Sequence, residues 1–222
     1  QPRPLWGIFA VSETEVWATG EGGAWRFDGS AWTHVVEGRT YGLVTQTRDG
    51  TVWLAGDDIS TVSGSTTVIV RPGPTPSLDS IATRGDTMLL GTTGGEILEC
   101  TRAGCTVNQG PTTFGAAIAA TPGALFVAER SSVWMKQGTG SWVMVGTDPS
   151  TFSAMSGDGA DGVYALASGG RLYHFDGAGA LRSKTTIPTE VLLRSLTVTD
   201  SGRSITVAGY SGALLTHEGA LP

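Results

Sequence analysis

Apolar residues occur along this chain in short runs that alternate with clusters of Gly, Ser, Asp and Pro. The runs are rich in Val, Trp, Phe and Thr, which are enriched in β-strands, and no stretch shows a helical period. The first part of the chain predicts four strands, at Leu5–Val11, Glu15–Thr19, Ala24–Phe27 and Ala31–Val36. Asp28-Gly29 predicts a tight hairpin turn, because Gly adopts positive φ and Asp bonds its own backbone.

This pattern of four strands repeats along the whole chain. A Pro or Gly opens each unit, at Pro2, Gly38, Pro74, Pro111, Pro149 and Pro188. The spacing grows from 36 to 39 residues, and the second strand returns as TVWLAG, TMLLG, ALFVAE, GVYALA and SITVAG. Six units predict an all-β, six-bladed β-propeller with antiparallel four-stranded blades, forming one domain over residues 1–222. A flat solenoid of the same strands is the alternative.

The sixth unit is shorter than the others. Alignment of AGYSGALLTHEG with TGEGGAWRFDG places Gly209 on Gly20, so a fourth strand would start near Ala220, close to Pro222. We therefore expect a three-stranded last blade. Its exposed edge would be a template for a strand from a protein partner.

The first unit carries motifs that resemble a known repeat. They are Trp6-Gly7, Ser12, Val16-Trp17-Ala18, Gly20, Gly23, Asp28-Gly29 and Trp32. This series resembles the repeats of secreted bacterial β-propeller proteins. TRDGTVWLAG in the second unit resembles two-component-regulator propellers and, more distantly, the Asp-box of sialidases, although Asp49 and Gly50 are adjacent here. The resemblance implies a fold and not an activity, because propellers host many unrelated functions.

Composition excludes some classes of partner. Only 15% of residues are charged and the net charge is −6, which argues against a nucleic-acid surface. No apolar run approaches the roughly 18 residues of a membrane-spanning helix. The sequence starts at Gln1 without Met, which fits a processed N-terminus or a piece excised from a longer chain.

Two cysteines, Cys100 and Cys105, flank the turn between the third and fourth strands of the third unit. Paired strands bring opposite Cβ atoms to about 4.5–5.5 Å, which favours a disulfide. It would close a small loop and stabilise modestly. Disulfides persist in oxidising compartments, so we expect an extracellular, cell-surface or periplasmic protein. A metal or redox pair is the alternative, but metal sites want further ligands that the nearby sequence does not supply.

Catalytic signatures are missing from the sequence: there is no G-x-S-x-G, no H-E-x-x-H and no phosphate-binding Gly loop before a helix. His34, His174 and His217 fall on outer strands of separate units, which favours structural roles. Asp158 and Asp161 in GDGADG are weak calcium candidates, and a plain turn is the favoured interpretation. We expect no enzyme activity and no cofactor.

A ligand of a propeller usually binds at the mouth of its channel. The turns between second and third strands lie there, and their chemically active residues are Glu21, Asp57, Asp58, Arg130 and Tyr210. This set is mixed and weakly acidic, so it suits a hydroxyl-rich ligand or a protein partner.

The tryptophans have two interpretations. Trp17 and Trp53 share a second-strand position, where packing between blades is the favoured role. Trp32 and Trp142 lie nearer the blade exteriors, and exposed indoles could stack on sugars. The leading hypothesis is a secreted, non-enzymatic propeller that serves as an interaction or scaffold subunit of a larger assembly. A lectin-like propeller is the alternative, followed by a glycan-active hydrolase or lyase.

Overall fold

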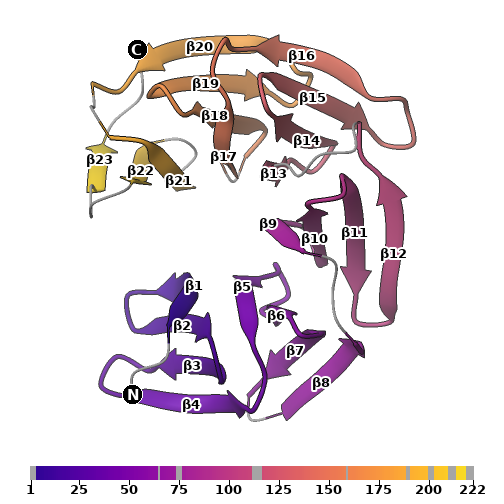
Figure 1. The fold of residues 1–222 in the computed structure, drawn as a ribbon, viewed down its shortest axis with the longest axis vertical. Helices are drawn as coiled ribbons and strands as arrows, with labels where there is room; N and C mark the ends of the chain where they lie inside the picture. The colour runs from indigo at the N-terminus through magenta and orange to yellow at the C-terminus, as the bar shows by residue number, and fades with distance from the viewer. Residues whose placement is uncertain are drawn as a thin grey trace. The chain divides into compact units, whose positions relative to one another are not determined.

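The computed structural model describes residues 4–64, 66–73, 77–111, 117–158, 160–188, 191–199, 203–209 and 214–218. Twenty-three strands in this part of the chain form six antiparallel sheets, whose strands follow one another in chain order. Figure 1 shows each sheet as a group of neighbouring arrows of similar colour. None of the described residues forms a helix that is long and apolar enough to cross a membrane.

The six sheets are six blades. Blade 1 contains β1 (Leu5–Ser12), β2 (Glu15–Gly20), β3 (Gly23–Phe27) and β4 (Trp32–Glu37). Blade 2 contains β5 (Tyr41–Gln46), β6 (Val52–Gly56), β7 (Ile59–Ser63) and β8 (Thr66–Arg71). Blade 3 contains β9 (Leu78–Arg84), β10 (Thr87–Thr92), β11 (Glu96–Thr101) and β12 (Gly104–Gln109). Blade 4 contains β13 (Ala117–Ala120), β14 (Ala124–Glu129), β15 (Ser132–Gln137) and β16 (Val143–Thr147). Blade 5 contains β17 (Phe152–Gly157), β18 (Gly162–Ala167), β19 (Arg171–Asp176) and β20 (Leu181–Thr186). Blade 6 contains β21 (Leu193–Thr199), β22 (Ser204–Gly209) and β23 (Leu214–Glu218).

This architecture is the six-bladed β-propeller that the repeat predicts. All four strands of blade 1 begin and end within one residue of their predicted bounds. In the described residues blade 6 has three strands, as its short repeat predicts.

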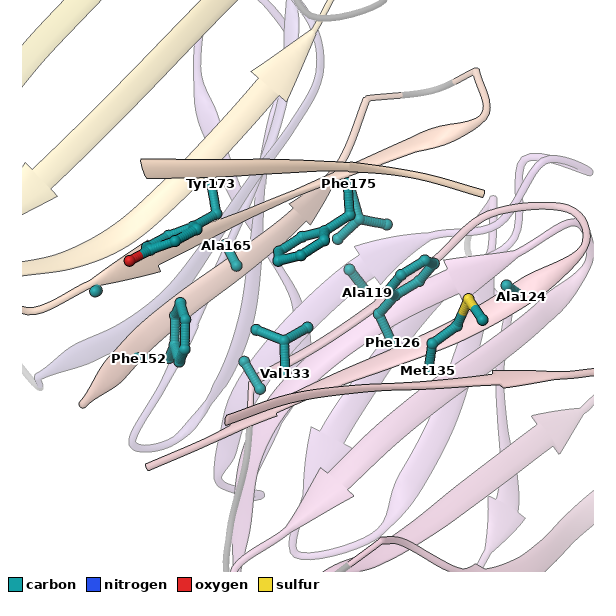
Figure 2. Packing of buried hydrophobic residues seen from close by; sticks show 12 residues of the cluster. Ala119, Ala124, Phe126, Val133, Met135, Phe152, Ala165, Tyr173 and Phe175 are labelled. Carbon is teal, nitrogen blue, oxygen red and sulfur yellow. The ribbon is translucent and has the colours of Figure 1, made fainter. Parts of the chain in front are cut away.

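Adjacent blades pack face to face. We call the face of a blade that packs on the preceding blade its A face, and the opposite face its B face. The B face of blade 1 supplies Trp17 to a buried cluster, and the A face of blade 2 supplies Leu54 and Val44. Figure 2 shows the same arrangement between blades 4 and 5, where Phe126 and Phe175 share one cluster. Two further clusters join blade 2 to blade 3 and blade 5 to blade 6 in this way.

The chain divides into two compact units, Gln1–Asn108 with blades 1 to 3 and Gln109–Pro222 with blades 4 to 6. The single domain that we expect over residues 1–222 stays a prediction.

Candidate functional site

The two predicted site residues of blade 2, Asp57 and Asp58, form the turn between β6 and β7. Asp57 is exposed, and its carboxylate accepts a hydrogen bond from the backbone N–H of Thr40 at 2.8 Å. Asp58 is fully buried and pairs with the guanidinium of Arg39. Its carboxylate also accepts hydrogen bonds from the hydroxyl of Tyr41 at 3.1 Å and from Ser60 Oγ at 2.5 Å. Asp58 therefore ties the chain entering β5 to this turn.

A second buried carboxylate, that of Asp148, ties the chain that enters blade 5 to the third strand of that blade. Asp148 lies before β17, and Arg171 at the start of β19 donates from Nε and Nη2 at 2.6 Å to each of its oxygens. The backbone N–H of Ser150 and the hydroxyl of Tyr173 donate to the same carboxylate. The hydrogen bonds from Arg171 hold the pKa of Asp148 far below its ordinary value.

The two ion pairs have opposite polarity. In blade 2 the acid lies in the turn after the second strand and the arginine lies in the connection between blades, whereas blade 5 has the reverse. Neither pair was predicted from the sequence. The available signal was a pair of opposite charges within one unit, one in the connection before the first strand and one at or directly before the start of the third strand: Arg39 with Asp58, and Asp148 with Arg171.

The other described residues of the predicted ligand face are Glu21 and Arg130. Glu21 is exposed in the turn between β2 and β3, and its backbone N–H donates to Pro4 O at 3.1 Å. Arg130 is exposed in the turn between β14 and β15, with φ of 45°, and its carbonyl accepts from Phe152 N at 2.6 Å. Tyr210 lies outside the described residues. The ligand face stays a prediction, with Glu21, Asp57 and Asp58 in the first unit and Arg130 in the second.

The calcium candidates form a turn. The carboxylate of Asp158 accepts hydrogen bonds from the backbone N–H groups of Ala160 at 2.7 Å and Gly162 at 3.0 Å. Asp161 is exposed. His174 Nε2 lies 3.7 Å from Asp158, and its ring stacks on Tyr164 with centroids 4.3 Å apart. Within the described ranges no three His, Cys, Asp or Glu side chains gather as metal ligands would.

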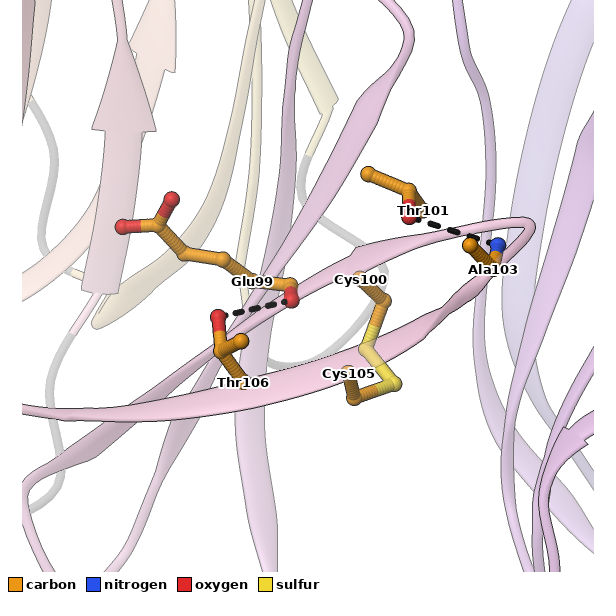
Figure 3. The surroundings of a disulfide bond; sticks show 6 residues. All are labelled: Glu99, Cys100, Thr101, Ala103, Cys105 and Thr106. Atoms are coloured by element: carbon orange, nitrogen blue, oxygen red, sulfur yellow. Dashed lines mark hydrogen bonds between the residues drawn. A yellow bond between two sulfur atoms is a disulfide. The ribbon is translucent and has the colours of Figure 1, made fainter.

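The two cysteines are joined. The Cys100–Cys105 disulfide links β11 to β12, next to a hydrogen bond from Thr106 Oγ1 to Glu99 O of 3.4 Å (Figure 3). Cys100 is fully buried in the cluster between blades 2 and 3, and Cys105 packs against that cluster. The bond therefore fastens the outer strand of blade 3 to its core.

The tryptophans divide between core and surface. Trp17 and Trp53 are buried, in agreement with a packing role. Trp142 donates its indole N–H to Gln109 O at 3.2 Å, and the ammonium of Lys136 lies 5.9 Å from the ring centroid. Trp32 is 52% exposed. It borders a groove of about 680 Å³ on blade 1, which is also lined by Leu5, Ala18, Gly22, Trp25, His34, Glu37 and Gly38.

A second groove lies within the other unit, beside the outer strand of blade 6. Its volume is about 280 Å³, and its lining residues are Leu172, Thr185, Thr186, Ile187, Pro188, Ile205, Val207, Leu215, Thr216 and His217. All five residues of β23 are exposed. In the described sheet β23 has one strand neighbour, β22. This edge and its groove are the best-defined candidate for a partner site.

The fold and these sites define the class of protein, a six-bladed β-propeller. The chain matches no protein-family model and no curated protein. Among solved structures it is similar to the WD40 β-propeller domain of Doa1, at 11% identity and a TM-score of 0.70, over 99% of this chain and 83% of that one. It is also similar to streptogramin B lyase, at 15% identity and a TM-score of 0.70, over 98% of this chain and 84% of that one. The structure of U3-55K matches at 8% identity with a TM-score of 0.77, over 97% of this chain and 77% of that one. At these identities the likeness shows the fold alone.

Proposed function

We propose that this chain is a non-enzymatic interaction or scaffold subunit of a larger assembly, which it joins through the open edge of blade 6. The observation that carries the proposal is β23, whose residues are all exposed and which pairs only with β22 in the described sheet. An unpaired strand edge offers a row of backbone donors and acceptors to another chain. The similarity to WD40 propellers is consistent with a role in protein interaction.

The engagement of the buried acids supports a non-enzymatic role. Asp58 and Asp148 are saturated by arginine, hydroxyl and backbone donors that hold the strands together. Asp158 holds the backbone of its own turn. Catalytic acids and bases need a substrate within hydrogen-bond reach, and these three carboxylates are occupied by the protein itself.

The interaction role is tested by affinity capture from the native source with the immobilised chain. We expect specific partners to be retained by the wild type and lost with Leu214→Lys, because a lysine on an edge strand opposes pairing. The matched control is Val68→Lys, an exposed position on β8, which is the outer strand of the complete four-stranded blade 2. Equal retention by both variants would show that the edge does not carry the function.

We also propose that the protein acts in an oxidising compartment, at the cell surface, outside the cell or in the periplasm. The Cys100–Cys105 disulfide supports this location, because cytosolic thiols are kept reduced. Alkylation of native protein, followed by mass measurement, should label no cysteine without reductant and both cysteines with it. Labelling of both without reductant would remove the support.

Glycan binding is the second candidate function, and the exposed Trp32 beside the blade 1 groove favours it. The groove combines two indoles with the imidazole of His34 and the carboxylate of Glu37, which lie 3.4 Å apart. However, His34 stacks on Trp25 with centroids 4.5 Å apart, so one face of that indole is already covered. A glycan array separates the two functions: binding that Trp32→Ala abolishes favours the lectin.

A further inference from the structure

One histidine lies on the face of blade 5 that packs against blade 6. His174 on β19 is opposite Tyr164 on β18, and Tyr164 belongs to the buried cluster that joins these two blades. Side chains directly opposite each other on paired strands share a face of the sheet. His174 therefore lies on the B face of blade 5, where its ring stacks on Tyr164 with centroids 4.3 Å apart.

The imidazole of His174 lies close to a carboxylate. Its Nε2 is buried without a hydrogen-bond partner in the described part of the chain, and it lies 3.7 Å from Asp158 Oδ2. Asp158 Oδ1 accepts from the backbone N–H groups of Ala160 and Gly162, which leaves Oδ2 for the imidazole. A Cβ on Gly162 would collide with both Oδ2 and Nε2, so the two groups converge on this glycine. At this distance a neutral imidazole makes no hydrogen bond, whereas an imidazolium is attracted to the carboxylate.

The same face is tied to blade 6. Ser156 on β17 lies opposite Tyr164, and its hydroxyl accepts a hydrogen bond of 3.2 Å from the backbone N–H of Val198 on β21. Val198 is itself buried in the cluster with Tyr164. Ser156, Tyr164 and His174 thus form a row across blade 5, and β21 is fastened to that row. A charge on His174 therefore arises beside the contact between the two blades.

The charges around His174 come from blade 5. The titratable groups that act on it or touch it are Asp158, Tyr164, Asp176 and Arg182, and Arg182 pairs with Asp176. Blade 6 packs on this face with aliphatic side chains, namely Leu193, Leu196, Val198, Ile205 and Val207. The charged or titratable residues in the described part of blade 6 are all exposed: Arg194, Arg203, His217 and Glu218. Burial lowers the pKa of His174, and this effect outweighs the attraction to Asp158.

We propose that His174 is a pH-sensitive switch for the contact between blades 5 and 6, whose protonation under mildly acidic conditions favours a state in which blade 6 has moved off this face and water reaches the imidazolium. In the packed state the cation is buried against an aliphatic surface, with Asp158 as its nearest counter-charge. Histidine is the side chain whose ordinary pKa allows such a change between pH 5 and 8. The switch acts within this chain and does not depend on a partner at the edge of β23.

The lowered pKa of His174 couples its protonation to the opening of blade 6. Because the folded-state pKa lies below the unfolded value of 6.5, the neutral ring stabilises the packed state above pH 6.5, and this contribution is lost as the pH falls further. A packed ring that stayed neutral throughout would raise the opening equilibrium about thirtyfold between pH 7.5 and pH 5. Attraction to Asp158 reduces this rise, so we expect about tenfold or somewhat less.

Hydrogen exchange of the full chain at pH 7.5, 6 and 5, corrected for the intrinsic pH dependence of amide exchange, tests the switch. The amides of β21 and β22 should open more as the pH falls, while those of the buried strand β14 in blade 4 change little. His174→Phe keeps a ring on Tyr164 and cannot be protonated, so it should remove the pH dependence of blade 6. The matched control is His34→Phe in the other unit, because His34 also stacks on an aromatic ring, that of Trp25, with centroids 4.5 Å apart. It should leave the response of blade 6 unchanged.

Two further variants separate the switch from a purely structural role. Asp158→Asn removes the counter-charge and should make the rise steeper, whereas damage to the turn alone would increase opening equally at every pH. His217→Gln on the exposed strand β23 should leave the response intact. If His174→Phe does not fold by circular dichroism, His174→Gln replaces it. The inference is overturned by equal opening of wild-type blade 6 at pH 7.5 and 5, by an NMR titration midpoint of His174 at or above pH 6.5, by a response that persists without His174, or by one that His217→Gln abolishes.

Discussion

At the scale of single residues, the buried carboxylates of Asp58 and Asp148 fasten two of the connections between blades to the start of the third strand of the following blade. Asp148 receives two hydrogen bonds from Arg171 at 2.6 Å, and its side chain is fully buried. Removal of one partner from such a pair is costly, because the remaining charge or donor is left in an apolar setting. The pair thus holds the entry to β17 against the start of β19.

The first prediction follows from the depressed pKa of Asp148. A folded-state pKa below the unfolded value means that the ionised group stabilises the fold above about pH 4, and that this contribution is lost as pH falls further. At pH 7, Asp148→Asn should cost about 2–4 kcal/mol, since Arg171 is partly exposed and the upper range for buried pairs is discounted. Chemical denaturation at pH 7, 4 and 2.5 should show that the difference in free energy of unfolding between the wild type and Asp148→Asn becomes smaller as the pH falls.

The control for this prediction is Asp86→Asn, in an exposed turn of blade 3. It should change the free energy of unfolding little at any of the three pH values. If Asp148→Asn lost stability equally at all three, ionisation would not be the source of the stabilisation.

The Asp-Gly turns show how far residue-level prediction reaches. Asp28 accepts hydrogen bonds from the backbone N–H groups of Ser30 and Ala31, and the bond from Ala31 is the largest cause that lowers its pKa to about 2. Asp176 has the same role, but Gly179 carries the positive φ there instead of Gly177, because the turn closes on Ala180, one residue later. The hydrogen bonds from the turn backbone to the Asp carboxylate could be predicted from the Asp-Gly dipeptide. The extra residue in the second turn could not.

At the scale of elements, the same register position has different surroundings in different blades. Ile8 lies opposite Ala18 in blade 1 and Val44 lies opposite Leu54 in blade 2. Val44 is 5% exposed under the B face of blade 1, whereas Ile8 is 74% exposed. Whether a neighbouring blade packs on that face, and not the strand itself, decides how much each side chain contributes to the stability of the fold.

The second prediction compares these two positions. Val44→Asp should cost more than about 3 kcal/mol, because it buries an unpaired charge between blades. Ile8→Asp should stay within about 1 kcal/mol of the wild type, since the side chain is exposed. Urea unfolding of both variants measures the contrast, and a similar large loss from Ile8→Asp would mean that this face is covered in solution.

The third prediction concerns the disulfide between β11 and β12. The double variant Cys100→Ala and Cys105→Ala should lower the free energy of unfolding by about 2 kcal/mol, because the closed loop is short. Reductant should destabilise the wild type by a similar amount and leave the double variant unchanged. A reductant effect on the double variant would trace the loss to something other than this bond.

The strands could be predicted from the sequence better than the contacts between them. Each strand is marked locally, by an apolar run and its flanking Gly or Asp, so the bounds in blade 1 are correct to one residue. The ion pair of Arg39 with Asp58 joins positions 19 residues apart, and it depends on how the connection lies over the turn. Such a contact has no local pattern, and neither does the groove beside β23, which exists because two blades meet.

At the scale of the whole molecule, the repeat determines the class of fold while the surface determines the partners. Solved propellers at 8–15% identity share the fold with this chain over nearly its full length. Sequences of low identity therefore produce the same fold. Function has to be sought in what distinguishes this chain, such as its net charge and the edge of blade 6.

The last prediction follows from the charge of the molecule. With 20 acidic and 14 basic residues the chain carries a net charge of −6 at pH 7, and its isoelectric point is near 5.0. Nucleic-acid binding depends on clustered cations that displace counterions from phosphates, so the chain should not retard a DNA oligonucleotide at pH 7 and about 50 mM salt. Its electrophoretic mobility should reverse near pH 5, where weaker repulsion between molecules should also give the lowest solubility. Retardation of DNA at pH 7 that fades as salt rises would reveal a basic patch that the net charge conceals, and would reopen nucleic acid as a partner.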